Sequence, residues 1–249
     1  MRIKKLFIIT IVLILAVGFY LYLANAYTYY FFKQVSLENP MVKNPYIFNG
    51  ETAGDSLIYA ALGDSLTSGM GLNKYEEAFP YLLAEDLAAG SKVILQNFSY
   101  SGYRTDDLIE NLLEPAIAAN PDIVTLLIGT NDVYGLYSSG KFKKNYQIIL
   151  ERLAKNTKAK IYAISLPYIG MQAYLPPNSY YFQNKTVEFN KTIKELAAAY
   201  EVGYIDIAET TRSQFAKDDL YYAADRFHPS AAGHELWEKI IFENITTER

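Results

Sequence analysis

Cysteine is absent from this chain of 249 residues, and histidine occurs only at His228 and His234. Without cysteine the chain can form no disulfide, no thiolate metal site and no cysteine nucleophile. Any reaction that requires an imidazole must therefore use one of these two residues. Hydrophobic residues make up 51% of the chain and charged residues 20%, which excludes an intrinsically disordered protein and indicates a globular one.

Positive charge is also scarce. The formal net charge is −4 at pH 7, and the body of the chain carries no basic stripe. Proteins that follow a phosphate backbone present such a stripe of Lys and Arg. We therefore expect no nucleic-acid partner.

The first segment contains a long run without charge. Arg2, Lys4 and Lys5 precede Leu6–Ala24, whose 19 residues contain no charged side chain. As a helix this run spans ~28 Å, close to the hydrocarbon thickness of a bilayer. The basic flank predicts a single-pass helix in the cell membrane, with the body of the chain outside the cytoplasm. Ala24 and Ala26 fit a small-residue cleavage site, which would make the protein secreted; a buried helix is the remaining alternative.

The sequence divides into three parts. We expect residues 1–26 to form a signal or transmembrane anchor, 27–56 a stalk or linker, and 57–249 one folded domain. Pro40 and Pro45 interrupt any helical pattern in the linker. At ~190 residues, the last part is long enough to bury a core of its own.

Strand and helix patterns alternate along the body of the chain. Short, β-branched apolar runs occur at Leu57–Leu62, Lys92–Gln96, Asp122–Ile128, Lys160–Leu166 and Gly203–Ile207. Helical apolar spacing occurs at Glu76–Ala89, Asp106–Ala119, Phe142–Lys155, Lys185–Tyr200 and Ala231–Asn244. Thr105 and Ser230 are placed to cap two of these helices. The alternation predicts an α/β fold of three layers, with a parallel five-stranded sheet between two layers of helices.

Polar residues follow the predicted strands where a parallel sheet binds its ligands. Ser65 follows the first strand, Gly102 the second and Asn131 the third. Asp225 and His228 precede the last helix. The topology can gather these five residues at one edge of the sheet.

The segments around these residues resemble those of the SGNH hydrolases, also called the GDSL esterase/lipase family. Ala61–Thr67 (ALGDSLT) resembles the first block of that family, Gly102 and Gly129–Asp132 the second and third, and Asp225–Pro229 the last. The four blocks occur in order over about three-quarters of the chain. The resemblance implies a flavodoxin-like α/β/α fold and carboxylic ester hydrolysis without a cofactor or a metal.

The chemistry of the residues agrees with this resemblance. The Ser65 hydroxyl needs a base, which His228 can supply, and Asp225 can hold the His228 ring in one tautomer. The family pattern assigns the oxyanion hole to the backbone N–H groups of Ser65 and Gly102 and to the side-chain amide of Asn131. Gly102 lacks a Cβ, which would let an oxyanion approach the backbone closely.

Three alternatives compete with this assignment. Gly54–Leu57 repeats the tetrapeptide GDSL, but Ser56 precedes the first strand and should lie at the opposite edge of the sheet. His234 lies inside the last helix, where a packing role is expected. A metal site built from His228, His234 and Asp225 would require a different mechanism, although the second histidine of an HExxH motif is missing because residue 238 is Glu.

Two connections rich in tyrosine should overhang the catalytic edge. They are Val133–Gly140 and Gly170–Gln183, the second of which lacks a helical period. We expect a substrate rim formed by Tyr134, Tyr137, Tyr174, Tyr180 and Tyr181. The predicted partner is an ester substrate, either a lipid or an acylated glycan. The alternatives are an O-acetylesterase of cell-surface polysaccharide and a catalytically silent surface binding module.

Overall fold

The computed structural model describes residues 2–34, 42–49, 56–168 and 174–247. Its sheet has six strands in the order β1-β3-β2-β4-β5-β6. The strands are β1 (Tyr46–Phe48), β2 (Leu57–Gly63), β3 (Val93–Ser99), β4 (Ile123–Leu127), β5 (Lys160–Ile164) and β6 (Gly203–Ile205). The last five pair in parallel, in the flavodoxin-like order, at the places where apolar runs predicted them.

The prediction of a five-stranded sheet missed one strand, because β1 adds a sixth at the edge. Tyr46–Phe48 pairs antiparallel with β3, with Tyr46 opposite Leu95. This strand lies within the segment predicted as a stalk. Asn44 fixes it further, because its side chain accepts the Asn97 backbone N–H at 2.9 Å and donates to the Asn97 carbonyl at 2.7 Å. Residues 42–48 therefore belong to the sheet rather than to a free linker.

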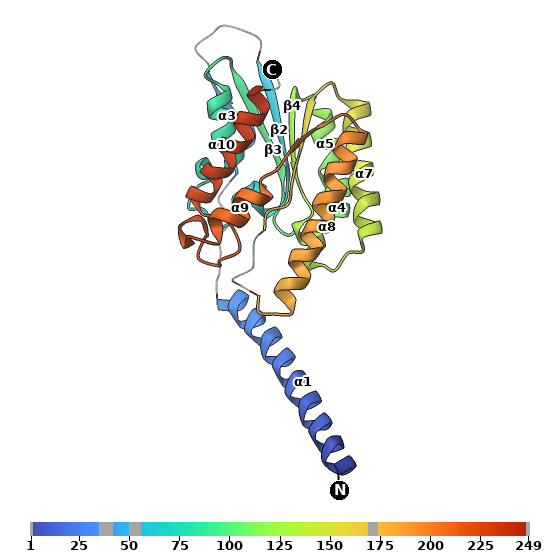
Figure 1. The fold of residues 1–249 in the computed structure, drawn as a ribbon. Coiled ribbons are helices and arrows are strands. Elements are labelled where there is room, and N and C mark those ends of the chain that lie inside the picture. The colour runs from blue at the N-terminus through green and yellow to red at the C-terminus, as the bar shows by residue number, and fades with distance from the viewer. Residues whose placement is uncertain (1, 35–41, 50–55, 169–173, 248–249) are drawn as a thin grey trace.

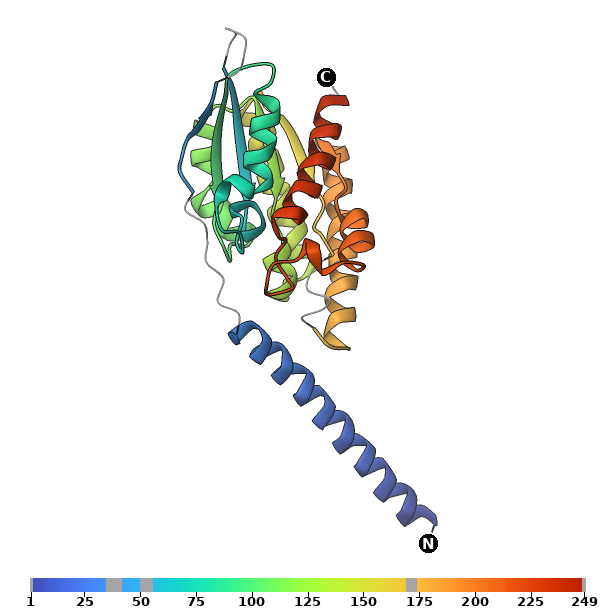
Figure 2. The same cartoon turned by 90° about the vertical axis from the view of Figure 1, so that its left-hand side faces the viewer.

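The helices form the two outer layers. They are α2 (Ser65–Ser68), η1 (Tyr75–Glu77), α3 (Phe79–Leu87), α4 (Thr105–Asn111), α5 (Leu113–Ala118), α6 (Thr130–Tyr134), α7 (Ser139–Asn156), α8 (Asn178–Ala199), α9 (Ala208–Phe215), η2 (Asp219–Tyr221) and α10 (Ala231–Thr247). Helices α3, α9 and α10 lie on one side of the sheet, and α4, α5, α7 and α8 on the other (Figures 1 and 2). The three-layer prediction is confirmed.

Prolines explain where the predicted helices are divided. Pro115 cannot donate a backbone hydrogen bond, and the single helix predicted over Asp106–Ala119 is divided at Leu112 into α4 and α5. Pro80 lies in the first turn of α3, where a proline is tolerated, and the chain before it forms the short η1. The expected cap at Thr105 was wrong: Arg104 precedes α4, and Asp107 accepts the Arg104 backbone N–H at 2.9 Å. Ser230 does cap α10, since its hydroxyl accepts the Gly233 N–H at 3.3 Å.

The N-terminal helix α1 (Arg2–Gln34) projects away from the domain (Figure 1). It is longer than the predicted run and continues into the segment assigned to the stalk. Residues Ile3–Tyr27 are long and apolar enough to cross a membrane. Their large apolar side chains, from Ile3 to Leu23, are exposed, as they would be against lipid.

Candidate active site

Ser65 lies directly beyond the carboxyl end of β2. It begins α2, and the carboxylate of the preceding Asp64 accepts the Leu66 backbone N–H at 3.0 Å. The helix ends at Gly69, whose left-handed backbone (φ 77°) closes the turn. This strand–turn–helix segment holds the Ser65 hydroxyl at the edge of the sheet, where only 6% of the residue is exposed.

His228 and Asp225 meet Ser65 from the far end of the chain. The Nε2 atom of His228 lies 2.9 Å from the Ser65 hydroxyl oxygen. Its Nδ1 atom lies 2.6 Å from the Asp225 Oδ2 atom. A serine, an imidazole and a carboxylate thus form one continuous hydrogen-bonded chain.

Asp225 is held in place by the backbone of its own loop. Its Oδ1 atom accepts the backbone N–H groups of Phe227 at 3.0 Å and of His228 at 2.9 Å. Burial raises the pKa of the Asp225 carboxyl, but the His228 hydrogen bond and charge, together with these N–H donors, outweigh it and hold the pKa below its usual value. A carboxylate that stays ionised can orient the imidazole and stabilise its protonated form.

Hydrogen bonds join the loop of Gly102 and the helix α6, which carries Asn131, to the nucleophile segment. The Ser68 and Ser101 hydroxyl oxygens lie 3.1 Å apart. The Asn131 side-chain amide donates to the Tyr103 carbonyl at 3.0 Å and to the Asp64 carboxylate at 3.5 Å. Gly102 has a φ of 85°, which explains a glycine there, and the space where a Cβ would project is open to 4 Å. The structure therefore gathers Ser65 at the start of α2, Gly102 in the loop after β3 and Asn131 in the first turn of α6.

Two buried carboxyl groups support this arrangement. Burial raises the pKa of Asp64 to about 7, with a smaller contribution from the charge of Asp132. Burial also raises the pKa of Asp132 to about 6, against the hydrogen bonds it receives from the Thr105 backbone and hydroxyl. Asn145 donates to the same hydroxyl at 3.0 Å. The Thr105 side chain thus links α7 to the loop of Asn131 rather than capping α4.

The competing residues lie elsewhere. Ser56 is exposed and precedes β2, so it is at the opposite edge of the sheet from Ser65; Gly54 and Asp55 lie outside the described residues. His234 is buried between Phe79 and Trp237, and its Nδ1 accepts the Phe79 N–H at 3.3 Å. Burial lowers the pKa of His234 to about 3, which keeps the ring neutral. Within the described residues, no group of three His, Cys, Asp or Glu side chains could hold a metal ion.

An aromatic cluster lies beside His228. Tyr134 stacks on Tyr174 with ring centroids 5.3 Å apart, and it also contacts Phe182 and Phe227 at 4.7 and 5.1 Å. The centroid of the Phe227 ring lies 4.9 Å from that of the His228 ring. Sequence reasoning missed Phe182 and Phe227, although the position of Phe227 next to the predicted base was a usable signal.

Two of the other predicted rim residues, Tyr137 and Tyr180, lie apart from this cluster, whereas the Tyr181 ring lies 5.5 Å from the ring of Phe182. The Tyr137 hydroxyl donates to the Asp106 carboxylate at 2.8 Å, and its ring faces Lys141. Tyr180 and Tyr181 are exposed in the first turn of α8. That helix begins at Asn178, so the predicted loop Gly170–Gln183 ends in a helix; residues 169–173 lie outside the described residues.

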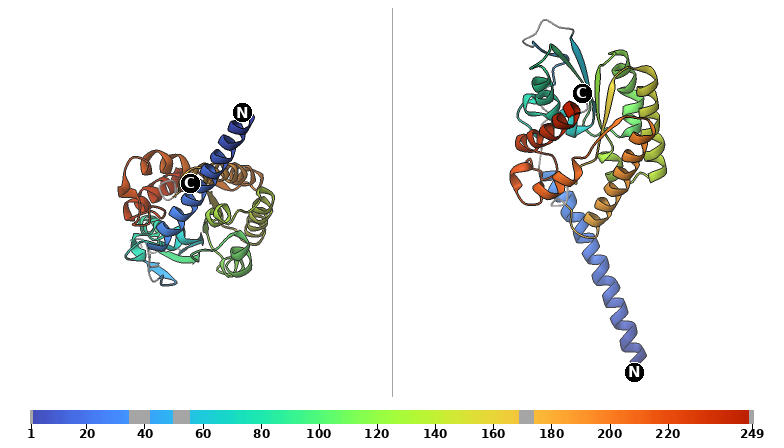
Figure 3. Two further views of the ribbon diagram at one scale, coloured as in Figure 1. Left: turned by 90° about the horizontal axis from the view of Figure 1, so that it is seen from below. Right: turned by 45° about the horizontal axis from the view of Figure 1, so that its top comes forward.

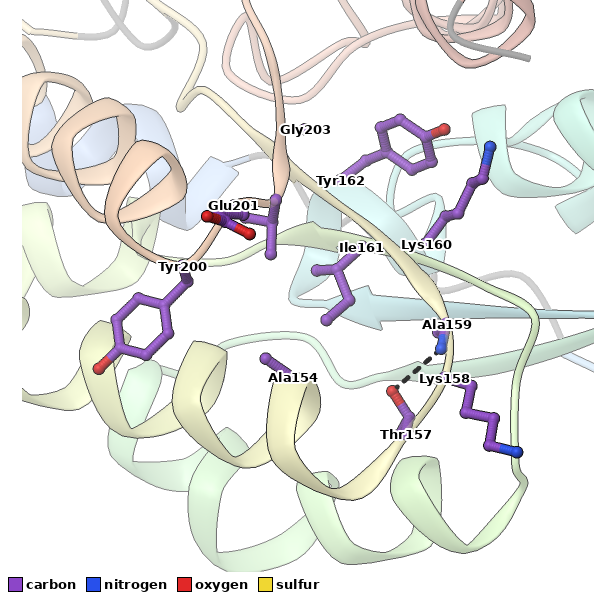
Figure 4. Close-up of a pocket in the computed structure, with 11 residues that line it drawn as sticks. Ala154, Thr157, Lys158, Ala159, Lys160, Ile161, Tyr162, Tyr200, Glu201 and Gly203 are labelled. Atoms are coloured by element: carbon purple, nitrogen blue, oxygen red, sulfur yellow. Dashed lines mark hydrogen bonds between the residues drawn. The ribbon is translucent and has the colours of Figure 1, made fainter.

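A pocket of about 460 Å³ opens at the amino edge of the sheet, away from Ser65. It lies between the end of α7, the start of β5 and the turn from α8 to β6 (Figure 4). Lys158, Lys160 and Glu201 line it, and no serine or histidine does. Ligands of parallel sheets bind at the carboxyl edge, so this pocket is not the candidate active site.

Known proteins are similar to this chain in sequence and in fold. The GDSL-like Lipase/Acylhydrolase family matches the chain over residues 61–236. The spore germination lipase LipC of Bacillus licheniformis is 29% identical over 204 residues, which cover 72% of this chain and 92% of that protein. An acetylxylan esterase of Geobacillus stearothermophilus is 29% identical over 166 residues, 61% of this chain and 72% of that protein.

Solved structures agree on the fold. The lipase/acylhydrolase from Enterococcus faecalis aligns with a TM-score of 0.62 and 24% identity, over 77% of this chain and 96% of that one. Axe2, an acetylxylan esterase from Geobacillus stearothermophilus, aligns with a TM-score of 0.63 and 20% identity, over 77% and 94% of the two chains. The residues matched by the family, 61–236, include Ser65, Asp225 and His228.

Proposed function

Because the chain belongs to the GDSL-like Lipase/Acylhydrolase family of ester hydrolases, we propose that it cleaves carboxylic esters through an acyl-enzyme on Ser65. One observation carries this proposal, the hydrogen-bonded chain from the Ser65 hydroxyl through His228 to Asp225. A serine hydroxyl is a poor nucleophile until an adjacent base can take its proton.

In the proposed reaction His228 moves one proton in each half. The Ser65 oxygen attacks the ester carbonyl while its proton passes to His228 Nε2. The resulting oxyanion accepts hydrogen bonds from the backbone N–H groups of Ser65 and Gly102 and from the Asn131 amide. Collapse of this intermediate breaks the bond to the alcohol, which takes the proton from His228. Water then attacks the acyl-enzyme, with His228 again as base, and releases the carboxylic acid and the free Ser65 hydroxyl.

We further propose that the enzyme is anchored by α1 in the cell membrane with its catalytic domain outside the cytoplasm. The apolar run Ile3–Tyr27 and the basic residues before it support this topology. In this proposal residues 1–26 are the anchor and 57–249 the catalytic domain, with residues 42–48 held on the sheet. Cleavage after Ala26 would instead release a secreted enzyme.

The aromatic cluster supports a lipid acyl chain as the preferred substrate group. Tyr134 and Tyr174 stack on each other at an interplanar angle of 11°, so each ring already uses one face. The cluster next to His228 therefore offers an apolar wall rather than a free ring for a sugar. An O-acetylesterase acting on polysaccharide is the second candidate, favoured by the similarity to an acetylxylan esterase.

An active-site fluorophosphonate probe tests the proposal, because labelling requires an activated serine. The full chain in detergent should be labelled, Ser65→Ala should lose the label, and the matched variant Ser56→Ala should keep it. A catalytically silent binding module would give no labelling. Labelling that survives in Ser65→Ala would contradict the assignment of the nucleophile.

A substrate panel then separates the two candidates. We expect long-chain p-nitrophenyl esters to be cleaved with a higher kcat/KM than the acetate ester. Preference for acetate together with release of acetate from acetylated xylan would favour the O-acetylesterase. A metal-dependent hydrolase would lose its activity in a chelator, which the serine mechanism predicts to be without effect.

A further inference from the structure

Most exposed large apolar side chains of the domain gather at the catalytic edge. Within the described part of 42–247 they are Ile47, Tyr100, Leu136, Leu175, Tyr180, Tyr181, Val187 and Leu220. Ile47 lies on the edge strand β1 and Val187 inside α8, and the other six lie in the connections that lead from the carboxyl end of a strand into the first turn of the next long helix. We refer to these six residues as the edge surface. Concentrated exposed apolar groups mark a contact with another apolar surface.

Helix α1 meets the same edge of the domain. The Tyr20 hydroxyl donates to the Pro176 carbonyl at 2.8 Å, and the Asn178 side chain donates to the Asn25 side chain at 3.1 Å. Figures 1 and 3 show the end of α1 beside the start of α8, below the sheet. Ala24, one turn beyond Tyr20, is buried. The anchor and the edge surface are therefore on the same side of the domain.

These contacts fall within the apolar run itself. Tyr20 and Asn25 both lie inside Ile3–Tyr27, and Tyr20 precedes the end of that run by ~10 Å along the helix. The headgroup layer on one side of a bilayer is only ~5–8 Å thick. The start of α8 is thus at the depth of the interface when α1 crosses the membrane.

Tyrosines mark the same level on the anchor. Exposed tyrosine side chains occur toward the carboxyl end of α1, at Tyr20, Tyr22, Tyr27, Tyr29 and Tyr30. Tyrosine is enriched where a helix leaves the hydrocarbon, because its ring is apolar and its hydroxyl is polar. Tyr180 and Tyr181 of the edge surface add exposed rings of the same kind.

We propose that the edge surface is a membrane-contact surface whose partner is the lipid bilayer, so that the active site faces the headgroups and takes its ester from the lipid side. This inference rests on the proposed anchor and deepens the proposed function. The opposite edge, with the pocket lined by Lys158 and Lys160 (Figure 4), then points away from the membrane. Lipid esters are the substrate class that such an orientation serves.

Single-cysteine labelling tests the orientation directly, because the chain contains no cysteine. Tyr180→Cys, Leu220→Cys and Lys158→Cys would each carry a nitrobenzoxadiazole label in the full chain, reconstituted in phosphatidylcholine–phosphatidylglycerol vesicles. A quencher on the lipid headgroup reports contact with the interface. The labels at 180 and 220 should lose most of their fluorescence, and the label at 158 should lose little. Leu220 is the stricter probe, since it lies on a different connection from the α8 start that contacts α1.

Two controls separate this inference from the proposed function. Ile14→Cys within α1 must be quenched from the acyl chains, and its failure would remove the anchor and the inference together. Ser65→Ala in the same labelled chains should leave every quenching value unchanged, because contact does not require catalysis. Equal quenching at 158 and 220, or none at either, overturns the membrane-contact surface even if soluble esters are still cleaved.

Discussion

Replacing Asp225 by asparagine should disable the base without disturbing the fold. The Oδ1 atom of Asp225 accepts two backbone N–H groups, from Phe227 and His228, at 3.0 and 2.9 Å. In Asp225→Asn only the amide oxygen can satisfy both donors, so the amide nitrogen must take the place of Oδ2. It then donates to His228 Nδ1, which lies 2.6 Å from that position.

This forced orientation inverts the imidazole tautomer. With Nδ1 as acceptor, the proton moves to Nε2, which faces the Ser65 hydroxyl at 2.9 Å. The ring then donates where it should accept and cannot take the serine proton. A comparable change in serine proteases lowers kcat by about 10,000-fold, which corresponds to about 5 kcal/mol in the barrier. We expect a loss of this order here.

The measurement is kcat for p-nitrophenyl butyrate, with the thermal midpoint as the test of folding. Asp219→Asn is the matched control, because Asp219 is an exposed carboxylate in the same segment whose side chain pairs with Arg226 at 3.2 Å. Such surface pairs contribute ~0–1 kcal/mol to stability, and we expect no change in kcat. If Asp225→Asn keeps more than a tenth of wild-type kcat, tautomer control by Asp225 is refuted.

Three further predictions concern the surroundings of Ser65. Asn131→Ala should lower kcat by about 100–1,000-fold, as expected for one lost oxyanion donor, while the chain stays folded with a slightly lower thermal midpoint because the hydrogen bonds to Tyr103 and Asp64 are lost; a change in KM alone would contradict that role. Between pH 5 and 8 the folded chain keeps protons on Asp64 and Asp132 that the unfolded chain releases, because the folded pKa values are raised. The free energy of unfolding should therefore rise as pH falls through this window. Urea titrations at several pH values should show a smaller dependence of this free energy on pH in Asp64→Asn than in the wild type. Gly63→Ala should lower the thermal midpoint strongly, since its Cβ would meet the Leu127 carbonyl at 2.6 Å, whereas Gly90→Ala, with open space, should not.

The sequence predicted the parts of the fold that have a strong local signal. Five parallel strands carry short apolar runs, and their observed ends lie within a few residues of the predicted ones. The residues Ser65 and Asn131 could be placed because each follows one of these strands, and ligand sites of parallel sheets form there. The meeting of His228 with Ser65 required the family resemblance, since 163 residues separate them.

Other elements had no local signal strong enough to read. Strand β1 has only three residues, too few for any periodicity, and it forms because the free edge of β3 accepts it. The first turns of α8 place Ser179 and Thr186 on the buried face. Polar residues at inward positions concealed the helical spacing that continues through Phe189 and Ile193. In both cases tertiary packing decided the structure.

The composition alone does not explain why the chain has so many tyrosines, but the structure divides them into groups with different surroundings. Tyr59, Tyr75, Tyr146 and Tyr162 are buried in the core. Tyr134 and Tyr174 form the wall beside His228. Among the described residues, the exposed ones lie on the carboxyl part of α1 and at the start of α8, where Tyr20 joins the two, except for Tyr100 in the loop after β3. Exposed rings serve either to stack on a sugar or to contact headgroups, and the second use fits the proposed lipid interface, because each ring gains contact with the layer that a lipid ester occupies. In the proposed arrangement the anchor, the edge surface and the active site share a single membrane-facing side, and the exposed tyrosines lie on it.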